Sequence, residues 1–470
     1  MASVHWSRGV WAGVALSLFF WTGCSKPQPN DGAGATPAVP ASGTTTEVTP
    51  TPTAPPTVPA VTPPPAKPTV PVPAAPPAIP ATANADDVKA ARTRIASLGS
   101  KAKAIPPEGD LLTEIVISDG SNLTADDIAL FGKLSDLEKL QIKDCRMLND
   151  EMAAQLSGLK GLTSLALTNT IINDVTVEMI VQSFPKLADL DLSSNTNMTS
   201  SVVKIVSAMS QLKQLTLVQN QVNDIGAMKL AKLQELTTLD LRGNMEAGDM
   251  ALEVVAALPK LTAFKHRSTA VSDSGLESLS HSQSLESLLM QDFNVSSQSG
   301  PHLAKLSKLT QLEIFRCQGF GSEGVLALKG MGLTRLTLRD LPNVSDPGME
   351  VFTDLPKLRR LYLWELASVS DTGLKHLAAL QSLEQLDLWS VPQMTDATVD
   401  VIVALPKLKD LTIRSTGVTD ATVDKLLGMK GLQSLKFYDN GSVTAEGAKK
   451  LATRTWKKLE LGTSGAGEAP

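Results

Sequence analysis

The sequence predicts an α/β solenoid, in which every repeat supplies one short strand and one short helix. One observation is a frame, Leu-x-x-Leu-x-Leu with conservative substitutions, that recurs about fifteen times between residues 108 and 461, at starts 24 or 25 residues apart. The other is composition. Aromatic residues make up only 4% of the 470 residues, which favours a core of stacked leucine, isoleucine and valine. A repeat array can grow to this length without one central core.

The two halves of each repeat carry different periodicities. The alternating Leu-x-Leu segment predicts a short strand with two side chains pointing inward. The second half has helical spacing, as in residues 275–279, and often opens with serine or threonine followed by aspartate. These are helix N-cap residue types, and the carboxylate also suits the positive end of the helix dipole. Because neither element buries its apolar side alone, parallel stacking should place strands on a concave face and helices on a convex face.

In this register, residues 108–461 resemble the leucine-rich-repeat superfamily, and the resemblance implies a right-handed, horseshoe-shaped solenoid. Units such as residues 137–150 and 358–371 resemble the cysteine-containing subclass found in F-box proteins, while residues 408–420 resemble a shorter bacterial variant. The superfamily also implies protein recognition through the concave face. The asparagine that caps the turn in the superfamily is kept only at Asn195, Asn220, Asn244 and Asn440.

The N-terminus resembles that of a bacterial lipoprotein. Residues 1–23 predict a signal peptide, with Arg8 in a weakly positive start and an apolar stretch too short to span a bilayer comfortably. It ends in WTGCS, where small residues directly before Cys24 resemble a lipobox. The resemblance implies that Cys24 receives a lipid, so that the protein crosses the inner membrane and stays anchored in the cell envelope, on its periplasmic or cell-surface side. Trp21 stands where the family usually has leucine, so a simple secretion signal or an uncleaved anchor remain alternatives.

Residues 24–85 predict a disordered tether between this anchor and the repeats. Residues 25–85 hold 18 of the 29 prolines, separated mainly by threonine, alanine and valine. Proline fixes φ and lacks an N–H, so neither a helix nor a sheet is expected, and the segment should be extended and partly polyproline II. Such a tether is either a spacer that crosses an envelope layer or a passive linker.

Both ends of the repeat array have flanking segments. Residues 86–107 predict an N-terminal capping helix, because Val88, Ala91, Ile95 and Leu98 recur at helical spacing and two prolines end the run. The apolar side of this helix should cover the open end of the first repeat. Residues 462–470 are expected to form a disordered tail.

Motifs for catalysis do not occur in the sequence. No metal-binding, phosphate-binding or nucleophile motif is found, so neither an enzyme nor a cofactor is expected. The 43 basic and 48 acidic residues form no Lys/Arg block, which argues against a nucleic-acid partner. His266 falls at a core position, where a buried, hydrogen-bonded histidine is expected. Cys145 and Cys317 occupy the asparagine position of repeats about 30 Å apart, so they are expected to be free buried thiols.

The third, fifth and seventh residues of the frame should face the concave side, and in the C-terminal half these are rich in aromatic residues and arginine. Tryptophan, tyrosine and arginine dominate the energetics of protein interfaces. Alternatively, the rings pack along the sheet and only stabilise it. The candidate ligand-binding residues are Phe315, Arg335, Arg339, Arg360, Tyr362, Trp364, Asp387, Trp389, Asp410, Arg414 and Tyr438.

Three functions fit the sequence. The leading hypothesis is an envelope-anchored scaffold that binds a protein ligand through the concave face of the C-terminal repeats. A second is a glycan-binding surface protein that uses Trp364 and Trp389 as stacking platforms. A third is a substrate adaptor like the F-box proteins, against which the proline-rich segment counts, because it cannot supply a folded helical domain before the repeats.

Overall fold

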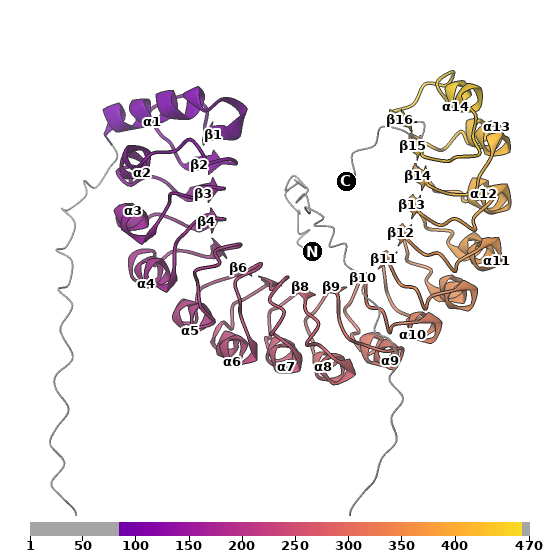
Figure 1. Ribbon diagram of the computed structural model, residues 1–470, viewed down its shortest axis with the longest axis horizontal. Helices are drawn as coiled ribbons and strands as arrows, with labels where there is room; N and C mark the ends of the chain where they lie inside the picture. The colour runs from indigo at the N-terminus through magenta and orange to yellow at the C-terminus, as the bar shows by residue number, and fades with distance from the viewer. Residues whose placement is uncertain (1–83, 463–470) are drawn as a thin grey trace, which may run out of the picture. The chain divides into compact units, whose positions relative to one another are not determined.

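The computed structural model describes residues 84–462. The expected signal peptide, Cys24, the tether and the C-terminal tail lie outside these residues. In the described part, a 16-stranded sheet follows the chain order and stays open, with β1 and β16 at its two edges (Figure 1). The strands line the inner side of the arc and the helices its outer side, as the two periodicities predict.

The strands are short and evenly spaced along the chain. Their bounds are β1 (Ala102–Ile105), β2 (Glu114–Ile117), β3 (Lys139–Lys143), β4 (Ser164–Thr168), β5 (Asp189–Asp191), β6 (Gln214–Thr216), β7 (Thr238–Asp240), β8 (Ala263–Arg267), β9 (Ser287–Gln291), β10 (Gln311–Phe315), β11 (Arg335–Arg339), β12 (Arg360–Trp364), β13 (Gln385–Trp389), β14 (Asp410–Arg414), β15 (Ser434–Tyr438) and β16 (Lys458–Gly462). From β2 onward neighbouring strands are parallel, and equivalent repeat positions pair with one another, as Leu361 does with Leu386.

The helices of the outer side are mostly one to three turns long. The α-helices are α1 (Ala85–Ser97), α2 (Ala125–Phe131), α3 (Asp150–Ala154), α4 (Asp174–Ser183), α5 (Val202–Val206), α6 (Asp224–Ala227), α7 (Asp249–Ala256), α8 (Asp273–Leu279), α9 (Ser299–Ala304), α10 (Ser322–Leu326), α11 (Asp371–Leu374), α12 (Asp396–Val403), α13 (Asp420–Gly428) and α14 (Ala445–Leu451). The 3₁₀ helices are η1 (Gly99–Lys101), η2 (Gln155–Gly158), η3 (Met228–Lys232), η4 (Asp346–Asp354) and η5 (Lys375–Ala379).

The leucine positions of the frame form a continuous core between the sheet and the helices. Leu215 and Leu386, for example, are completely buried. The retained asparagines cap the turns as the resemblance implies. The side-chain amide of Asn195 donates to the carbonyls of Leu167 and Leu192, at 2.7 and 2.8 Å, and its oxygen accepts from the backbone N–H of Thr170 at 2.9 Å.

Cysteine fills the same position in two other repeats. Cys145 and Cys317 are both free and completely buried, which confirms the expectation of two separate thiols. Burial raises the pKa of both thiols, that of Cys317 to about 12. A thiol that stays protonated is a poor nucleophile, so these cysteines belong to the core rather than to a reactive site.

A left-handed residue follows most of the strands. Glu365, directly after β12, has a φ of 57°, and the equivalent residues Ser390 and Ser415 have 53° and 52°. This conformation is uncommon for residues with a Cβ atom. The frame does not predict it, because acidic, basic and hydroxyl residues all occupy the position.

Aspartates at the helix N-termini connect consecutive repeats. Asp371 accepts from the backbone N–H and the hydroxyl of Thr395 in the next repeat, at 2.9 and 2.6 Å, and also from the hydroxyl of Thr398. Asp249 and Ser272 form the same arrangement. The sequence predicts these aspartates as partners of their own helix dipole. The structure adds a hydrogen-bond ladder that joins each helix to the next.

The N-terminal cap differs from the single helix expected for residues 86–107. Helix α1 ends at Ser97, and the chain then forms β1, which pairs with β2 in antiparallel fashion. Arg92 secures the following loop by donating to the carbonyls of Gly109 and Leu111 at 3.0 and 2.7 Å. The cap therefore covers both the core, through Val88, Ala91 and Ile95 of α1, and the first sheet edge. Within residues 84–462, no helix is long and apolar enough to cross a bilayer.

Candidate binding face on the concave side

The structure brings the predicted binding residues together on six neighbouring strands, β10 to β15. The seventh positions of these repeats pair in register to form one row. We call this row the Arg–aromatic ladder; its members are Phe315, Arg339, Trp364, Trp389, Arg414 and Tyr438. Together with Arg335, Arg360, Tyr362, Asp387 and Asp410 they make up what we call the C-terminal patch. Arg360 is exposed and the other residues of the patch are half-buried.

The aromatic rings of the patch touch edge to face. The ring centroids of Trp364 and Trp389 lie 5.9 Å apart at an interplanar angle of 67°, and those of Tyr362 and Trp364 lie 5.6 Å apart at 77°. Such T-shaped pairs are favourable for aromatic side chains. The indole N–H of Trp364 also donates to Asp387 at 2.8 Å. Trp364 is thus fixed in one orientation.

Arginine guanidinium groups lie over these rings. The guanidinium carbon of Arg339 lies 4.3 Å from the ring centroid of Phe315, and 5.5 and 5.3 Å from those of Trp364 and Trp389. Arg414 lies 4.9 Å from the centroids of both Trp389 and Tyr438. Each cation–π contact of this kind is worth about 0.5–1 kcal/mol at an exposed site. The rings therefore expose less of their faces than a row of isolated aromatics would.

Carboxylates from the turns hold the two ladder arginines in place. Glu365 accepts from the Nε of Arg339 at 3.0 Å, and Asp439 accepts from the Nε of Arg414 at 3.1 Å. Glu365 and Asp439 are themselves the left-handed residues that follow β12 and β15. The turn geometry thus aims a carboxylate back at the concave face. The sequence analysis missed both residues, because they lie outside the alternating strand positions.

Two acids on the patch or beside it are less acidic than usual. Burial raises the pKa of Asp387, although hydrogen bonds from Trp364 and Thr412 oppose the shift. Burial likewise raises the pKa of Glu313 on β10, against the attraction of Arg335 and other nearby cations. The pKa of the Tyr362 hydroxyl is also raised by burial. The patch is therefore a partly desolvated surface, on which new polar contacts are strengthened.

On the N-terminal half of the concave face, two short acidic side chains are hydrogen-bonded within the face. Asp191 accepts from the backbone N–H of Ser193 at 2.9 Å, and Asp189 accepts from the hydroxyl of Ser164 at 3.0 Å. Burial raises the pKa of both aspartates. These short side chains offer few free groups and no large ring, so they are weaker candidates for binding than the C-terminal patch.

Exposed large apolar side chains recur in several repeats of the N-terminal half, which was not predicted from the sequence. They lie in the loops after the strands and in the helical turns of the repeats between residues 147 and 250. The large ones are Met147, Ile171, Val175, Ile225, Met228, Met245 and Met250. Ile225 is 72% exposed, which is the highest value among the large apolar residues of the described chain. Exposed apolar residues can also mark an interface, so these residues provide a competing location for binding.

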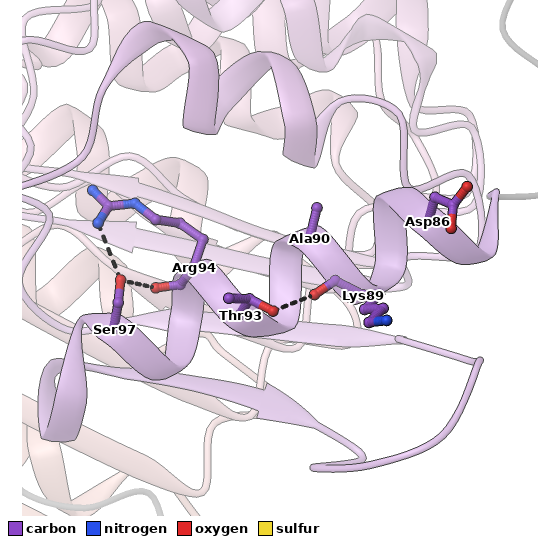
Figure 2. A pocket seen from close by; sticks show the side chains of 6 residues that line it. All are labelled: Asp86, Lys89, Ala90, Thr93, Arg94 and Ser97. Atoms are coloured by element: carbon purple, nitrogen blue, oxygen red, sulfur yellow. Dashed lines mark hydrogen bonds between the residues drawn. The ribbon is translucent and has the colours of Figure 1, made fainter.

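A shallow hollow lies on the exposed side of α1, and the hydroxyls and the guanidinium group that line it already have local partners (Figure 2). The hydroxyl of Thr93 donates to the carbonyl of Lys89 at 2.9 Å, and that of Ser97 donates to the carbonyl of Arg94 at 2.6 Å. Arg94 also pairs with Asp127 at 2.8 Å, which joins α1 to α2. We interpret this side of α1 as part of the cap.

The described residues hold no cluster of three or more histidine, cysteine, aspartate or glutamate side chains arranged to bind a metal. His266 is completely buried, as its register predicts. Its Nδ1 lies 3.0 Å from the carbonyl oxygen of Leu241 and its Nε2 lies 2.8 Å from that of Ala247. The ring packs between Phe264 and Phe293. This histidine is part of the core.

Comparison with known proteins supports the repeat fold. Residues 305–329 match the family model described as leucine-rich repeat. The fold resembles that of a protein in the yeast Rad7–Elc1 complex, with a TM-score of 0.50 and 16% identity over 82% of this chain and 90% of that one. It also resembles an internalin, InlF, from Listeria monocytogenes, with a TM-score of 0.41 and 23% identity over 66% and 76% of the two chains.

A chain of the mouse RP105/MD-1 complex gives a TM-score of 0.42 and 16% identity over 70% of this chain and 51% of that one. No curated protein matches the sequence. The register of the repeats, the open sheet that is parallel from β2 onward and the matched repeat together show a leucine-rich-repeat solenoid with a horseshoe fold.

Proposed function

We propose that this protein is a scaffold of the cell envelope that binds a protein ligand through the C-terminal patch. The observation that carries the proposal is the Arg–aromatic ladder, in which six consecutive strands present rings and guanidinium groups in register. These residue types dominate interface hot spots. The likeness in fold to the Rad7–Elc1 complex, in which a chain of this fold assembles with another protein, agrees with the proposal.

A protein ligand fits the ring geometry better than a glycan does. A sugar stacks on an open ring face, whereas Trp364 and Trp389 meet edge to face and Arg339 lies over both. The F-box-like alternative needs a folded adaptor domain before the repeats. Among the described residues, only the capping elements α1, η1 and β1 precede the first repeat strand.

We further propose that a lipid on Cys24 anchors the scaffold, with the proline-rich segment as a spacer. The support is the small residues before Cys24 and the apolar stretch that precedes them. The wild-type protein should partition into detergent, and Cys24→Ala should release it from the membrane or block its processing. Recovery of the wild-type protein wholly in the soluble fraction, beginning at Ser25 or later, would contradict the anchor.

Binding can be tested by capture from an envelope extract. The full chain serves as bait beside Trp389→Ala, and captured proteins are identified and purified. We expect at least one protein to be retained by the wild type and lost from Trp389→Ala, while Lys143→Ala, at the same repeat position on β3, retains it. A ligand that Trp389→Ala and the wild type retain equally would argue against the patch.

A further inference from the structure

The two arginines at the third repeat position of β11 and β12 differ from those of the ladder. Arg335 and Arg360 pair in register on neighbouring strands, which places them about 4.8 Å apart along the sheet. Among residues 84–462, neither has a carboxylate within 4.0 Å. Arg335 lies 5.0 Å from the ring centroid of Tyr362, which orients it, and Arg360 is exposed. The concave face thus carries two adjacent arginines that form no ion pair within the described residues, although Glu313 and Glu384 lie near enough to attract them.

Other donors of the C-terminal patch also lack partners within the described chain. The indole N–H of Trp389 and the hydroxyls of Tyr362 and Tyr438 make no hydrogen bond there, in contrast to the indole N–H of Trp364. All of them can donate, so a ligand rich in hydrogen-bond acceptors would satisfy them.

The acids nearest to the arginine pair form no ion pair with it within the described residues. Glu313 lies one strand away on β10, at the deeper fifth position, and makes no ion pair within 4.0 Å in the described chain. Burial raises the pKa of this carboxyl, against the attraction of Arg335. Asp410 lies on β14, two strands from Arg360. Both guanidinium groups therefore remain able to pair with an anion from outside the described chain.

We propose that the protein ligand of the C-terminal patch contributes an acidic peptide segment, and that its aspartate or glutamate side chains pair with Arg335 and Arg360. This proposal rests on the protein-binding function proposed above and specifies its ligand. The planar forks of two adjacent guanidinium groups suit bidentate binding of carboxylates. The indole N–H of Trp389 is free to donate to a backbone carbonyl of the same segment. A peptide is favoured over an acidic glycan because the ring faces are partly covered by Arg339 and Arg414.

The test uses fluorescent poly-L-glutamate as the probe and the purified full chain, with affinity measured by anisotropy. We expect saturable binding that weakens as salt is raised. The double variant Arg335→Gln/Arg360→Gln should bind the probe about tenfold to a hundredfold more weakly. The matched control is Lys143→Gln/Lys265→Gln, which removes the same charge from concave positions on β3 and β8 that also lack an ion pair in the described chain. It should bind as the wild type does.

Three results would overturn the proposal. The first is that the wild type does not bind poly-L-glutamate. The second is that both double variants lose affinity equally. The third is arginine-dependent binding of polygalacturonate without binding of poly-L-glutamate, and this result would indicate an acidic glycan. Capture of the envelope ligand separates this inference from the proposed function. If poly-L-glutamate fails while capture still depends on Trp389, only the acidic peptide is wrong. If capture does not depend on Trp389 either, the patch itself is wrong as the binding site.

Discussion

At the scale of single residues, His266 is completely buried, and its environment favours a charged ring by hydrogen bonding but a neutral ring by desolvation. Both of its ring nitrogens face carbonyl oxygens, but a neutral imidazole has only one N–H to donate. An imidazolium would satisfy both carbonyls, yet the cost of burying its charge is larger. Burial lowers the pKa of His266 below its usual value, although the two carbonyls and the nearby Asp240 oppose the shift.

This histidine should make the stability of the array depend on pH. Because its pKa is lower in the folded chain, the unfolded chain takes up the proton first as the pH falls below about 6.5. The free energy of unfolding should therefore decrease on acidification, by at most about 1.4 kcal/mol per pH unit from this group. His266→Leu should reduce that slope in urea titrations at several pH values. An unaltered slope in His266→Leu would refute this account.

At the scale of elements, the hydrogen-bond ladder between helices explains why glycine or threonine recurs two residues after the aspartate. Thr398 and Thr422 donate a hydroxyl to the aspartate of the preceding repeat. At the same place in α11, Gly373 has no side chain, and this leaves room for Asp346 of the preceding repeat. A Cβ atom there would lie 2.7 Å from the Oδ1 of Asp346 and 2.8 Å from its Cα. Asp346 cannot easily move, because it holds the N–H and the hydroxyl of Ser370.

Gly373→Ala should therefore destabilise the array by about 1–3 kcal/mol, through overpacking at this contact. The usual preference of helices for alanine over glycine, about 1 kcal/mol, predicts the opposite sign. Gly428→Ala is the matched control, since it lies in α13 and a Cβ atom there would have no neighbouring atom within 4 Å. It should be neutral or slightly stabilising. Urea denaturation measures both, and stabilisation by both alanines would show that the close contact is unimportant.

The fold could be predicted from the sequence wherever the spacing of apolar residues within a repeat determines the structure. The strands, their register and the inward direction of residues such as Leu386 follow from the frame alone. The Asp371–Thr395 ladder, the space at Gly373 and the antiparallel β1 could not be predicted, because they depend on contacts between residues that lie far apart in the sequence. The left-handed turns were also missed, since no single residue type marks them.

The candidate site was predictable to the same extent. Alternation along each strand placed Trp364 and Trp389 on one face, and their pairing in register confirms this placement. The sequence did not indicate that Arg339 would lie over three rings or that Glu365 would hold it there. Those contacts arise only once the turn has adopted its left-handed conformation and the repeats are stacked.

At the scale of the whole molecule, the described array presents two surfaces that differ in chemistry. The C-terminal patch has rings, guanidinium groups and unmatched donors. The other surface carries the exposed large apolar side chains of the N-terminal half, of which Ile225 is the most exposed. The central claim is that the C-terminal patch is the surface that binds. Because the two surfaces lie on different repeats, single substitutions can distinguish them.

The most direct test is the affinity of the captured and purified ligand for four forms of the full chain, measured by titration calorimetry. These are the wild type, Trp389→Ala, Lys143→Ala and Ile225→Ser. Loss of one ring that becomes buried in an interface costs a few kcal/mol, so Trp389→Ala should weaken binding more than tenfold. Its own stability should fall by only about 1–2 kcal/mol from the lost ring and cation–π contacts, which leaves the array folded. Lys143→Ala and Ile225→Ser should bind within about twofold of the wild type. Normal affinity of a folded Trp389→Ala, or a large loss in Ile225→Ser, would contradict the account.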